Sequence, residues 1–300
     1  MRKSAPKCIV MFLLALLSLC ISSTSHATEG GGGAYNNGVE GFGAGMFPPP
    51  GTYLLNYITY YTADSLKDKD GNNAIPQFEL NAVAEVLRVV HVTKYKLLGG
   101  NVAMQAILPL VHLEVTVPGR SQSNNGLGDL VISPLILSWH SKNLHYAAGV
   151  DVDIPIGAYD KNDLANIGRN YWTFVPIVAA TYLSDSGFEV SGKFMYDINT
   201  KNDDTSYLSG QEFHFDYTLA QKFNAFSAGV GGYFYKQVTD DEQNGIKVGS
   251  DGNKGQVFAI GPQIKYDYKN MSFSFKYQKE LLVENKPEGD KFWFNLMYAF

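Results

Sequence analysis

Polar and apolar residues alternate along most of this chain with a period of two. In the stretch "GQEFHFDYTLAQKF" (210–223), the polar set is Glu212, His214, Asp216 and Thr218, and the apolar set is Phe213, Phe215, Tyr217 and Leu219. A period of two places successive side chains on opposite faces of a β-strand. The pattern therefore predicts a strand with one polar face and one aromatic, apolar face.

Twelve segments of this kind follow one another. To within a few residues they cover 50–62, 77–92, 100–115, 127–140, 144–155, 171–184, 187–198, 209–222, 226–238, 255–268, 271–282 and 290–300. Strands in soluble proteins cluster near roughly five or six residues. These segments are about 11 to 16 residues long, which suffices for tilted membrane strands, since these need about 9 to 11 residues to cross the hydrocarbon.

The connections between the segments alternate in length. The long ones are expected at 63–76, 116–126, 156–170, 199–208, 239–254 and 283–289. Long external loops, short periplasmic turns and an even strand number are typical of outer-membrane barrels. We therefore predict an all-β fold, a transmembrane antiparallel up-and-down β-barrel of about 12 strands, of the outer-membrane type. The alternative is a soluble β-sandwich or a lipocalin-like barrel, which explains neither the strand length nor the loop pattern.

The first 27 residues have the pattern of a secretory signal peptide. Arg2, Lys3 and Lys7 precede an apolar run at 8–21, and small residues lead up to Ala27. We expect cleavage after Ala27. A retained anchor would need a longer run, of roughly 20 residues, and lipidation at Cys20 would need a small residue before it.

Composition narrows the function further. Both cysteines, Cys8 and Cys20, fall in the signal peptide, so the mature chain has no disulfide and no cysteine-based site. Loss of the signal leaves 21 basic against 29 acidic residues, a net charge of −8. A nucleic-acid partner, which requires a basic face, is therefore not expected. The expected location is the bacterial outer membrane.

Residues 28–50 do not form a strand in this prediction. Stretch 28–51 contains nine glycines and three consecutive prolines. It is either a disordered periplasmic leader or a plug folded into the lumen, where glycine permits tight turns. The plug hypothesis divides the mature chain into segment 28–50 and barrel 51–300. The residues that would pack the plug are Tyr35, Phe42, Met46 and Phe47.

Six stretches together resemble one known family. They are "GVEGFGAGMFPPPGTYLLNYITYYTAD", "GLGDLVISPLILSW", "DVDIPIGAYD", "NIGRNYWTFVPIVAATY", "GFEVSGKFMYDINTKNDDTSYLSGQEFHFDY" and "GVGGYFYKQVTDD". In this order they resemble the outer-membrane barrel family named after the meta-pathway of phenol degradation. The resemblance implies a transporter of the outer membrane, associated with genes for degrading aromatic compounds. It brings no catalytic motif with it.

The polar faces of the strands predict a charged lumen. The candidate lumen-lining residues are Glu79, Glu85, Asp151, Asp153, Glu189, Lys193, Asp197, Glu212, His214, Asp216 and Lys276. Buried charges must be paired, so one interpretation is a network that braces a narrow barrel. The other is a selectivity lining that favours cations or neutral polar solutes over anions.

Catalysis and metal binding have little support. Glu212, His214 and Asp216 share one face, but they are about 7 Å apart along the strand and have no nucleophile assigned to them. The loop "YDKNDLANIG" faintly resembles a calcium loop, yet Leu164 stands where a ligand would be needed. We expect no enzyme activity, no cofactor and no metal site.

Two prolines stand inside predicted strands. Pro109 and Pro134 are expected to face each other if their hairpin is centred on 116–126. Proline removes a donor from the ladder and is confined to edges or bulges. The alternatives are a harmless bend and a lateral opening through which an apolar solute could leave into the bilayer.

The last residues, "KFWFNLMYAF", form the twelfth segment. We expect this strand to pair with the first and to place Phe292, Phe294, Leu296, Tyr298 and Phe300 on the lipid face. The terminal Phe300 matches the ending by which the barrel assembly machinery recognises its substrates. The expected partners are outer-membrane lipid, lipopolysaccharide, that machinery and a small-molecule solute.

These predictions combine into one function with one alternative. The first is a porin-like channel or transporter for passive uptake of small molecules, hydrophobic or aromatic ones among them. The alternative is a structural or surface-interaction barrel whose acidic external loops do the work.

Overall fold

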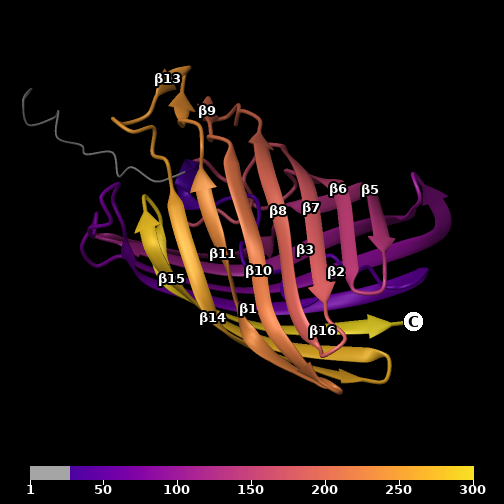
Figure 1. Ribbon diagram of the computed structural model, residues 1–300. Helices are drawn as coiled ribbons and strands as arrows, with labels where there is room; N and C mark the ends of the chain where they lie inside the picture. Colours follow the sequence, from indigo (N-terminus) through magenta and orange to yellow (C-terminus); the bar gives the residue numbers. More distant parts are fainter. Residues whose placement is uncertain (1–27) are drawn as a thin grey trace, which may run out of the picture.

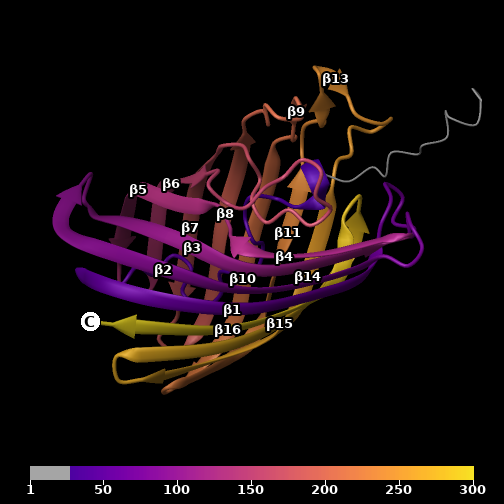
Figure 2. The same ribbon diagram turned by 180° about the vertical axis from the view of Figure 1, so that it is seen from behind.

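The main sheet of the molecule closes on itself. The structure, a computed structural model, describes residues 28–300, so the predicted signal peptide lies outside the described residues. Neighbouring strands are antiparallel, and the last long strand pairs with the first. Figure 1 and Figure 2 show the ring of strands from two sides. This confirms the predicted all-β barrel.

Thirteen strands form the ring. They are β1 (Gly51–Leu66), β2 (Glu79–Leu97), β3 (Gly100–Val117), β4 (Arg120–Leu127), β5 (Leu130–His140), β6 (Leu144–Ile154), β7 (Thr173–Leu183), β8 (Phe188–Asn199), β10 (Glu212–Phe223), β11 (Phe226–Gln237), β14 (Gln256–Tyr268), β15 (Met271–Glu284) and β16 (Pro287–Ala299). β4 and β5 both pair with β3, one above the other, and together they fill one position. The barrel therefore has twelve strand positions, as predicted.

Small elements gather at one end of the barrel. β9 (Tyr207–Leu208), β12 (Glu242–Gln243) and β13 (Ile246–Lys247) form a three-stranded sheet in the long loops. The 3₁₀ turn η1 (Glu29–Gly31) lies at the same end, and the C-terminus lies at the opposite end. We call these the outer and the periplasmic end, following the loop lengths of outer-membrane barrels.

The closing strand has the predicted orientation. β16 pairs with β1 from Tyr53↔Ala299 to Leu66↔Pro287, and with β15 on its other side. Phe294, Tyr298 and Phe300 are exposed, whereas Trp293 is buried inside the barrel. The apolar positions of "KFWFNLMYAF" therefore face outward.

Large apolar side chains cover the outside of the barrel. Exposed examples from several strands are Val89, Met104, Tyr146, Val178, Phe194, Leu219, Val230, Ile264 and Phe275. A closed barrel pairs its backbone groups internally, so it can carry such a surface in lipid. The molecule is a transmembrane barrel of the bacterial outer membrane. The described chain contains no helix that is both long and apolar enough to cross a membrane.

The prediction of long loops at 116–126 and 283–289 is wrong. Residues 116–126 form the tip of a β3–β4 hairpin that turns at Pro118–Gly119, and residues 283–289 turn at Asn285–Lys286. Ser121 pairs with Thr116 on the exposed face of the first hairpin. These polar strand residues have the composition of a loop, which is why the sequence pattern misplaced them.

Candidate functional site

The N-terminal segment, residues 28–50, runs inside the barrel. The Asp216 carboxylate accepts hydrogen bonds from the backbone N–H groups of Gly38 (2.8 Å) and Glu40 (2.9 Å). From another strand, the Lys276 ammonium donates to the carbonyls of Gly38, Val39 and Glu40 at 2.6, 2.7 and 3.0 Å. Buried charges thus bind the backbone of the segment from two sides.

Gly38 is required at this turn. Its φ of +85° lies in the left-handed region, and a Cβ there would approach the Gln278 side chain to 2.3 Å. Only glycine meets both conditions. The segment is therefore fitted closely to the barrel wall at this point.

Three of the four predicted plug residues contact the wall. Tyr35 packs on His214 at 4.9 Å between ring centroids and donates its hydroxyl to Asp216. Phe42 lies beneath the Lys265 ammonium at 5.9 Å, and Phe47 packs against an apolar cluster near the periplasmic end. Met46 remains 38% exposed. The segment is ordered against the lumen wall along much of its length.

An ion-pair network joins the segment to the wall. Glu40 accepts from Arg88 Nη1 at 2.9 Å and lies 3.4 Å from Lys193 Nζ. Lys193 also lies 3.7 Å from Asp151, whose carboxylate accepts from the Ser133 hydroxyl. Burial of such charges is tolerated because each has a partner.

Nine of the eleven predicted lumen residues are buried on the inner face. They are Asp151, Asp153, Glu189, Lys193, Asp197, Glu212, His214, Asp216 and Lys276. His214 Nε2 lies 2.8 Å from Asp197 Oδ1, and Glu189 accepts from the Gly43 N–H at 2.6 Å. Among residues 28–300 no group of three or more His, Cys, Asp or Glu side chains is arranged to hold a metal ion.

Glu79 and Glu85 do not line the lumen, so that prediction is wrong. Both are exposed on the outer face of β2, where Glu85 accepts from Asn56 Nδ2 at 2.7 Å. The inner face of β2 carries Leu80, Ala82, Ala84, Val86 and Arg88. Because this strand is apolar on both faces, charge did not identify its inner side.

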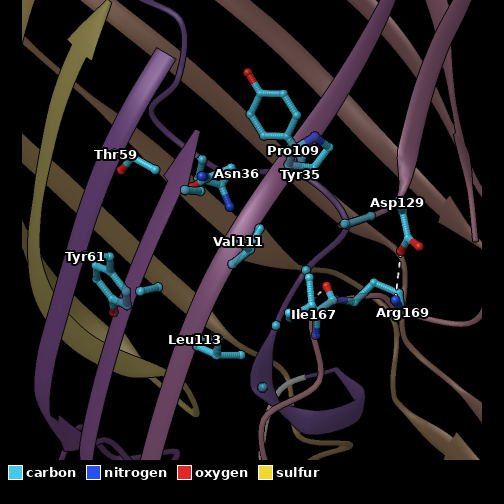
Figure 3. A pocket seen from close by; sticks show the side chains of 18 of the residues that line it. Tyr35, Asn36, Thr59, Tyr61, Pro109, Val111, Leu113, Asp129, Ile167 and Arg169 are labelled. Carbon is cyan, nitrogen blue, oxygen red and sulfur yellow. Dashed lines mark hydrogen bonds between the residues drawn. The ribbon is translucent and has the colours of Figure 1, made fainter. Parts of the chain in front are cut away.

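The apolar inner faces of β2 and β3 line a cavity of about 540 Å³. Thr59 and Tyr61 of β1, and Pro109, Val111 and Leu113 of β3, form one side (Figure 3). Tyr35 and Asn36 of the N-terminal segment, with Ile167 and Arg169 of the loop 155–172, form the other. The size is that of a small-molecule site, which is typically mostly apolar with a few polar groups.

The sequence pattern did not reveal this cavity. Its signal is the apolar majority on both faces of "LNAVAEVLRVV" (80–90), where Asn81, Glu85 and Arg88 are the polar residues, and of "AILPLV" (106–111). In a barrel with a polar lumen, such strands mark a place where the inner wall is apolar as well.

The barrel wall is interrupted beside the cavity. The β3–β5 ladder ends at Ile107↔Val131, and the β3–β4 ladder begins at Leu110↔Leu127. β6 pairs with β5 only as far as Leu130↔Ile154. In the described chain β4 pairs with no strand other than β3, so its second edge is left open above this point.

The loop 155–172 covers the interruption through a small number of hydrogen bonds. Ala158 N donates to Leu127 O at 3.0 Å, and Asp129 accepts from Gly157 N at 2.8 Å and from Arg169 N at 2.7 Å. Gln122 of β4 donates to Asp163 and accepts from Leu164 N. The gap is closed by these contacts instead of a continuous ladder.

The two prolines do not face each other, contrary to the prediction. Pro109 lies opposite Val86 of β2, and its ring abuts Gly128. Pro134 lies in a bulge of β5, between Ser133 and Ile136. The hairpin turns earlier than the predicted centre, which separates the two prolines along the wall, but Pro109 does stand at the interruption.

Comparison with known proteins decides the family. The model of the family described as "Putative MetA-pathway of phenol degradation" matches residues 63–296, most of the chain. The chain belongs to this family. A search of the curated proteins gave no match.

Solved structures agree on the fold. The COG4313 outer membrane channel from Pseudomonas putida F1 is similar with a TM-score of 0.78 and 18% identity, over 87% of this chain and 100% of that one. At this identity the likeness establishes the fold. The KdgM porin has a TM-score of 0.44 and 8% identity over 82% of this chain and 99% of that one, too low to argue from.

Proposed function

We propose that this family member takes up small hydrophobic molecules, aromatic ones among them, by passive passage through the barrel. The observation that carries the proposal is the cavity of about 540 Å³ inside the barrel, which has an apolar wall along β2 and β3 and borders the interruption of the β3 ladders. Burial of apolar surface stabilises such a solute by roughly 25 cal/mol per Å². The description of the matching family supports an aromatic solute.

The route we propose is lateral. The N-terminal segment lies across the lumen and is hydrogen-bonded to several strands, so it opposes straight passage along the axis. The interruption at Gly128–Asp129 offers a shorter way from the cavity into the bilayer. An apolar solute that leaves there enters lipid without passing along the charged inner faces of β8, β10 and β15.

A reversible crosslink tests the route. A Cβ on Gly126 would lie 3.0 Å from Cβ of Ala158, so Gly126→Cys with Ala158→Cys should form a disulfide across the gap after slight relaxation. Residues 28–300 contain no cysteine of their own. We expect oxidation to lower uptake of radiolabelled toluene by cells about tenfold or more, and a reductant to restore it.

The matched control crosslinks the same hairpin away from the gap. The Thr116 and Ser121 hydroxyls are 2.9 Å apart on its exposed face, so Thr116→Cys with Ser121→Cys stiffens the hairpin and leaves the gap free. Uptake that is equally insensitive to both crosslinks would contradict lateral passage. Uptake that does not depend on the protein at all would favour a structural or surface-interaction barrel.

A further inference from the structure

The first described residue is bound at the outer end of the barrel. Thr28 is fully buried, and its hydroxyl donates to Gly32 O at 2.6 Å. Its backbone nitrogen hydrogen-bonds the carboxylate of Asp241, in the long loop after β11. The next residue, Glu29, is held by Ser209 and Asn202 of a different loop. Several external loops therefore converge on the start of the described chain.

Asp241 is a buried acid surrounded by neutral donors. Its carboxylate accepts from Tyr207 OH at 2.6 Å, from Gly210 N at 2.7 Å and from Gln237 Nε2 at 2.7 Å. Burial raises the pKa of Asp241 to about 6 in spite of these bonds. A buried carboxylate of this kind is stabilised most by a cationic partner.

The backbone of Thr28 supplies an independent observation. Its φ is +59° and its ψ is 160°, a region that is essentially restricted to glycine and costs about 1–3 kcal/mol for other residues. Threonine is β-branched, which makes a positive φ still less favourable. The angle φ measures rotation relative to the preceding carbonyl carbon, so a chain that begins at Thr28 has no such strain.

We propose that Thr28 is the first residue of the mature protein and that its α-ammonium group binds Asp241 as a charged ligand. Hydrolysis of the Ala27–Thr28 bond by a signal peptidase adds the hydroxyl of water to the Ala27 carbonyl and leaves an amino group on Thr28. That amine takes up a proton, because α-amino groups titrate near about 7.7–8.0. One neutral N–H donor thereby becomes an ammonium with three donors.

The ion pair between Thr28 and Asp241 can form only after export, once the signal peptide has been removed. Only the processed chain carries the ammonium, so only the processed chain forms the ion pair that joins the N-terminal segment to the outer loops. The hydrogen bond from the ammonium to the Asp241 carboxylate is stronger than the hydrogen bond from the backbone amide N–H that it replaces. The inference concerns the maturation of the barrel and does not depend on which solute passes through it.

Chemical labelling of the amine tests the ion pair. Folded purified protein is treated with acetic anhydride at pH 7, and the N-terminal peptide is quantified by mass spectrometry. An ion pair that raises the pKa of the amine by one unit lowers the free-amine fraction about tenfold. We therefore expect Thr28 to react at least about tenfold more slowly in the folded than in the denatured protein.

Two substitutions separate Asp241 from its neighbour. Asp241→Asn should restore rapid labelling of Thr28. Asp240→Asn should not, because Asp240 pairs with Lys247 and Lys254 on the loop surface. The proposal is overturned if the mature chain starts at another residue, or if the wild-type amine reacts as fast when folded as when denatured.

A one-residue extension covers the case in which Asp241→Asn fails to fold. An extra alanine before Thr28 moves the ammonium away and leaves Asp241 with an amide donor. The pKa of Asp241 in the folded protein then lies above its value in the unfolded chain. The contribution of Asp241 to the order of loop 239–254 is therefore complete at low pH and is lost as pH rises through about 6. Glu212, Tyr207, Tyr235 and Lys286 also interact electrostatically with Asp241 and are the same in both proteins.

We expect proteolysis of loop 239–254 to increase between about pH 4 and about pH 6 in the extended protein, where Asp241 loses its proton, and to stay level in the wild type. Identical pH profiles for the two proteins would show that the amide serves Asp241 as well as the ammonium, and would overturn the proposal.

Discussion

Two charged side chains, Asp216 and Lys276, hold the N-terminal segment through hydrogen bonds to its backbone. Asp216 accepts two backbone N–H groups and the Tyr35 hydroxyl, and Lys276 donates to three backbone carbonyls. Hydrogen bonds to charged groups each contribute about 1.5–3 kcal/mol. The segment is rich in glycine and offers little apolar surface, so these bonds account for much of its attachment.

Lys276→Met should loosen the segment without disturbing the barrel. The substitution keeps the length of the side chain but removes the ammonium donor from the carbonyls of Val39 and Glu40, and leaves Gly38 O with Gln278 Nε2 at 3.2 Å. We expect the free energy of releasing the segment to fall by about 2–4 kcal/mol. Chymotrypsin, which cuts after aromatic residues such as Tyr35 and Phe42, should then cleave the folded protein many times faster.

Lys279→Met is the matched control. It lies on the same strand, but its ammonium bonds Asp290 on the outer surface at 2.9 Å. Chymotrypsin should cleave the N-terminal segment of the Lys279→Met protein at the wild-type rate. Equal rates for the wild type and Lys276→Met would mean that the ammonium does not hold the segment.

Residue-level prediction from the sequence worked where one face of a strand is polar. Glu212, His214 and Asp216 lie inside the barrel because the alternate positions are aromatic and face lipid. β2 offered no such contrast. Glu85 and Arg88 differ by three positions and must point to opposite sides, so one of the two charges had to face outward, and alternation alone could not decide which.

The closing strand β16 shows how most of an element can be predicted. Large apolar residues stand at every second position from Phe292 to Phe300, and the strand has β1 and β15 as neighbours and ends at the periplasmic edge. Its start at Pro287 lies within a predicted loop. Phe300 adds little to the folded structure. It is 80% exposed, and its ring contact is with Tyr298 at 5.0 Å.

Removal of Phe300 should therefore impair assembly more than stability. We expect the amount of folded barrel in the outer membrane to fall about tenfold or more, whereas export across the inner membrane continues and signal cleavage is unchanged. The free energy of unfolding of the barrel that does fold should lie within about 0.5 kcal/mol of the wild-type value, as expected for an exposed position. Heat-modifiability on gels and urea titration measure the two quantities.

Leu98→Ser is the control for loss of an exposed apolar side chain at the periplasmic end, where Leu98 is as exposed as Phe300. It should leave assembly intact. If deletion of Phe300 and Leu98→Ser have equal effects, Phe300 is not an assembly signal.

The β4–β5 position was the hardest element to predict. Its prolines indicated a disturbed ladder, and Pro109 does lie at the interruption. However, the break also depends on the early hairpin turn, on the bulge at Pro134 and on loop 155–172, none of which leaves a periodic signal. Polar residues on β4 satisfied the loop pattern equally well.

At the scale of the whole molecule, the lumen is divided lengthwise. The inner faces of β8, β10 and β15 are charged and hold the N-terminal segment, whereas the inner faces of β2 and β3 are largely apolar, apart from Arg88 and Gln105, and line the cavity. Alternation predicted the polar half, and the Gly/Pro-rich composition left open whether segment 28–50 is a leader or a plug. The division itself follows only when strands far apart in sequence are placed around one ring.

Deletion of residues 30–45 should open the polar half of the lumen to ions and leave the apolar cavity wall in place. The segment fills the polar half, and a twelve-strand barrel is wider than one filled by its own side chains. We expect single-channel conductance to rise at least about threefold, with a preference for cations because buried acids outnumber buried bases in the lumen. Planar-bilayer recording with a salt gradient measures both.

The same deletion combined with the Gly126→Cys and Ala158→Cys crosslink tests whether ions and apolar solutes use different routes. The crosslink closes the wall beside the apolar half, and the deletion opens the polar half. Because an apolar solute gains nothing from a charged, hydrated path, toluene uptake should stay low in the oxidised double variant while ion conductance stays high. If toluene uptake recovers together with conductance, apolar solutes pass along the barrel axis, and the gap beside Gly128 is a structural irregularity only.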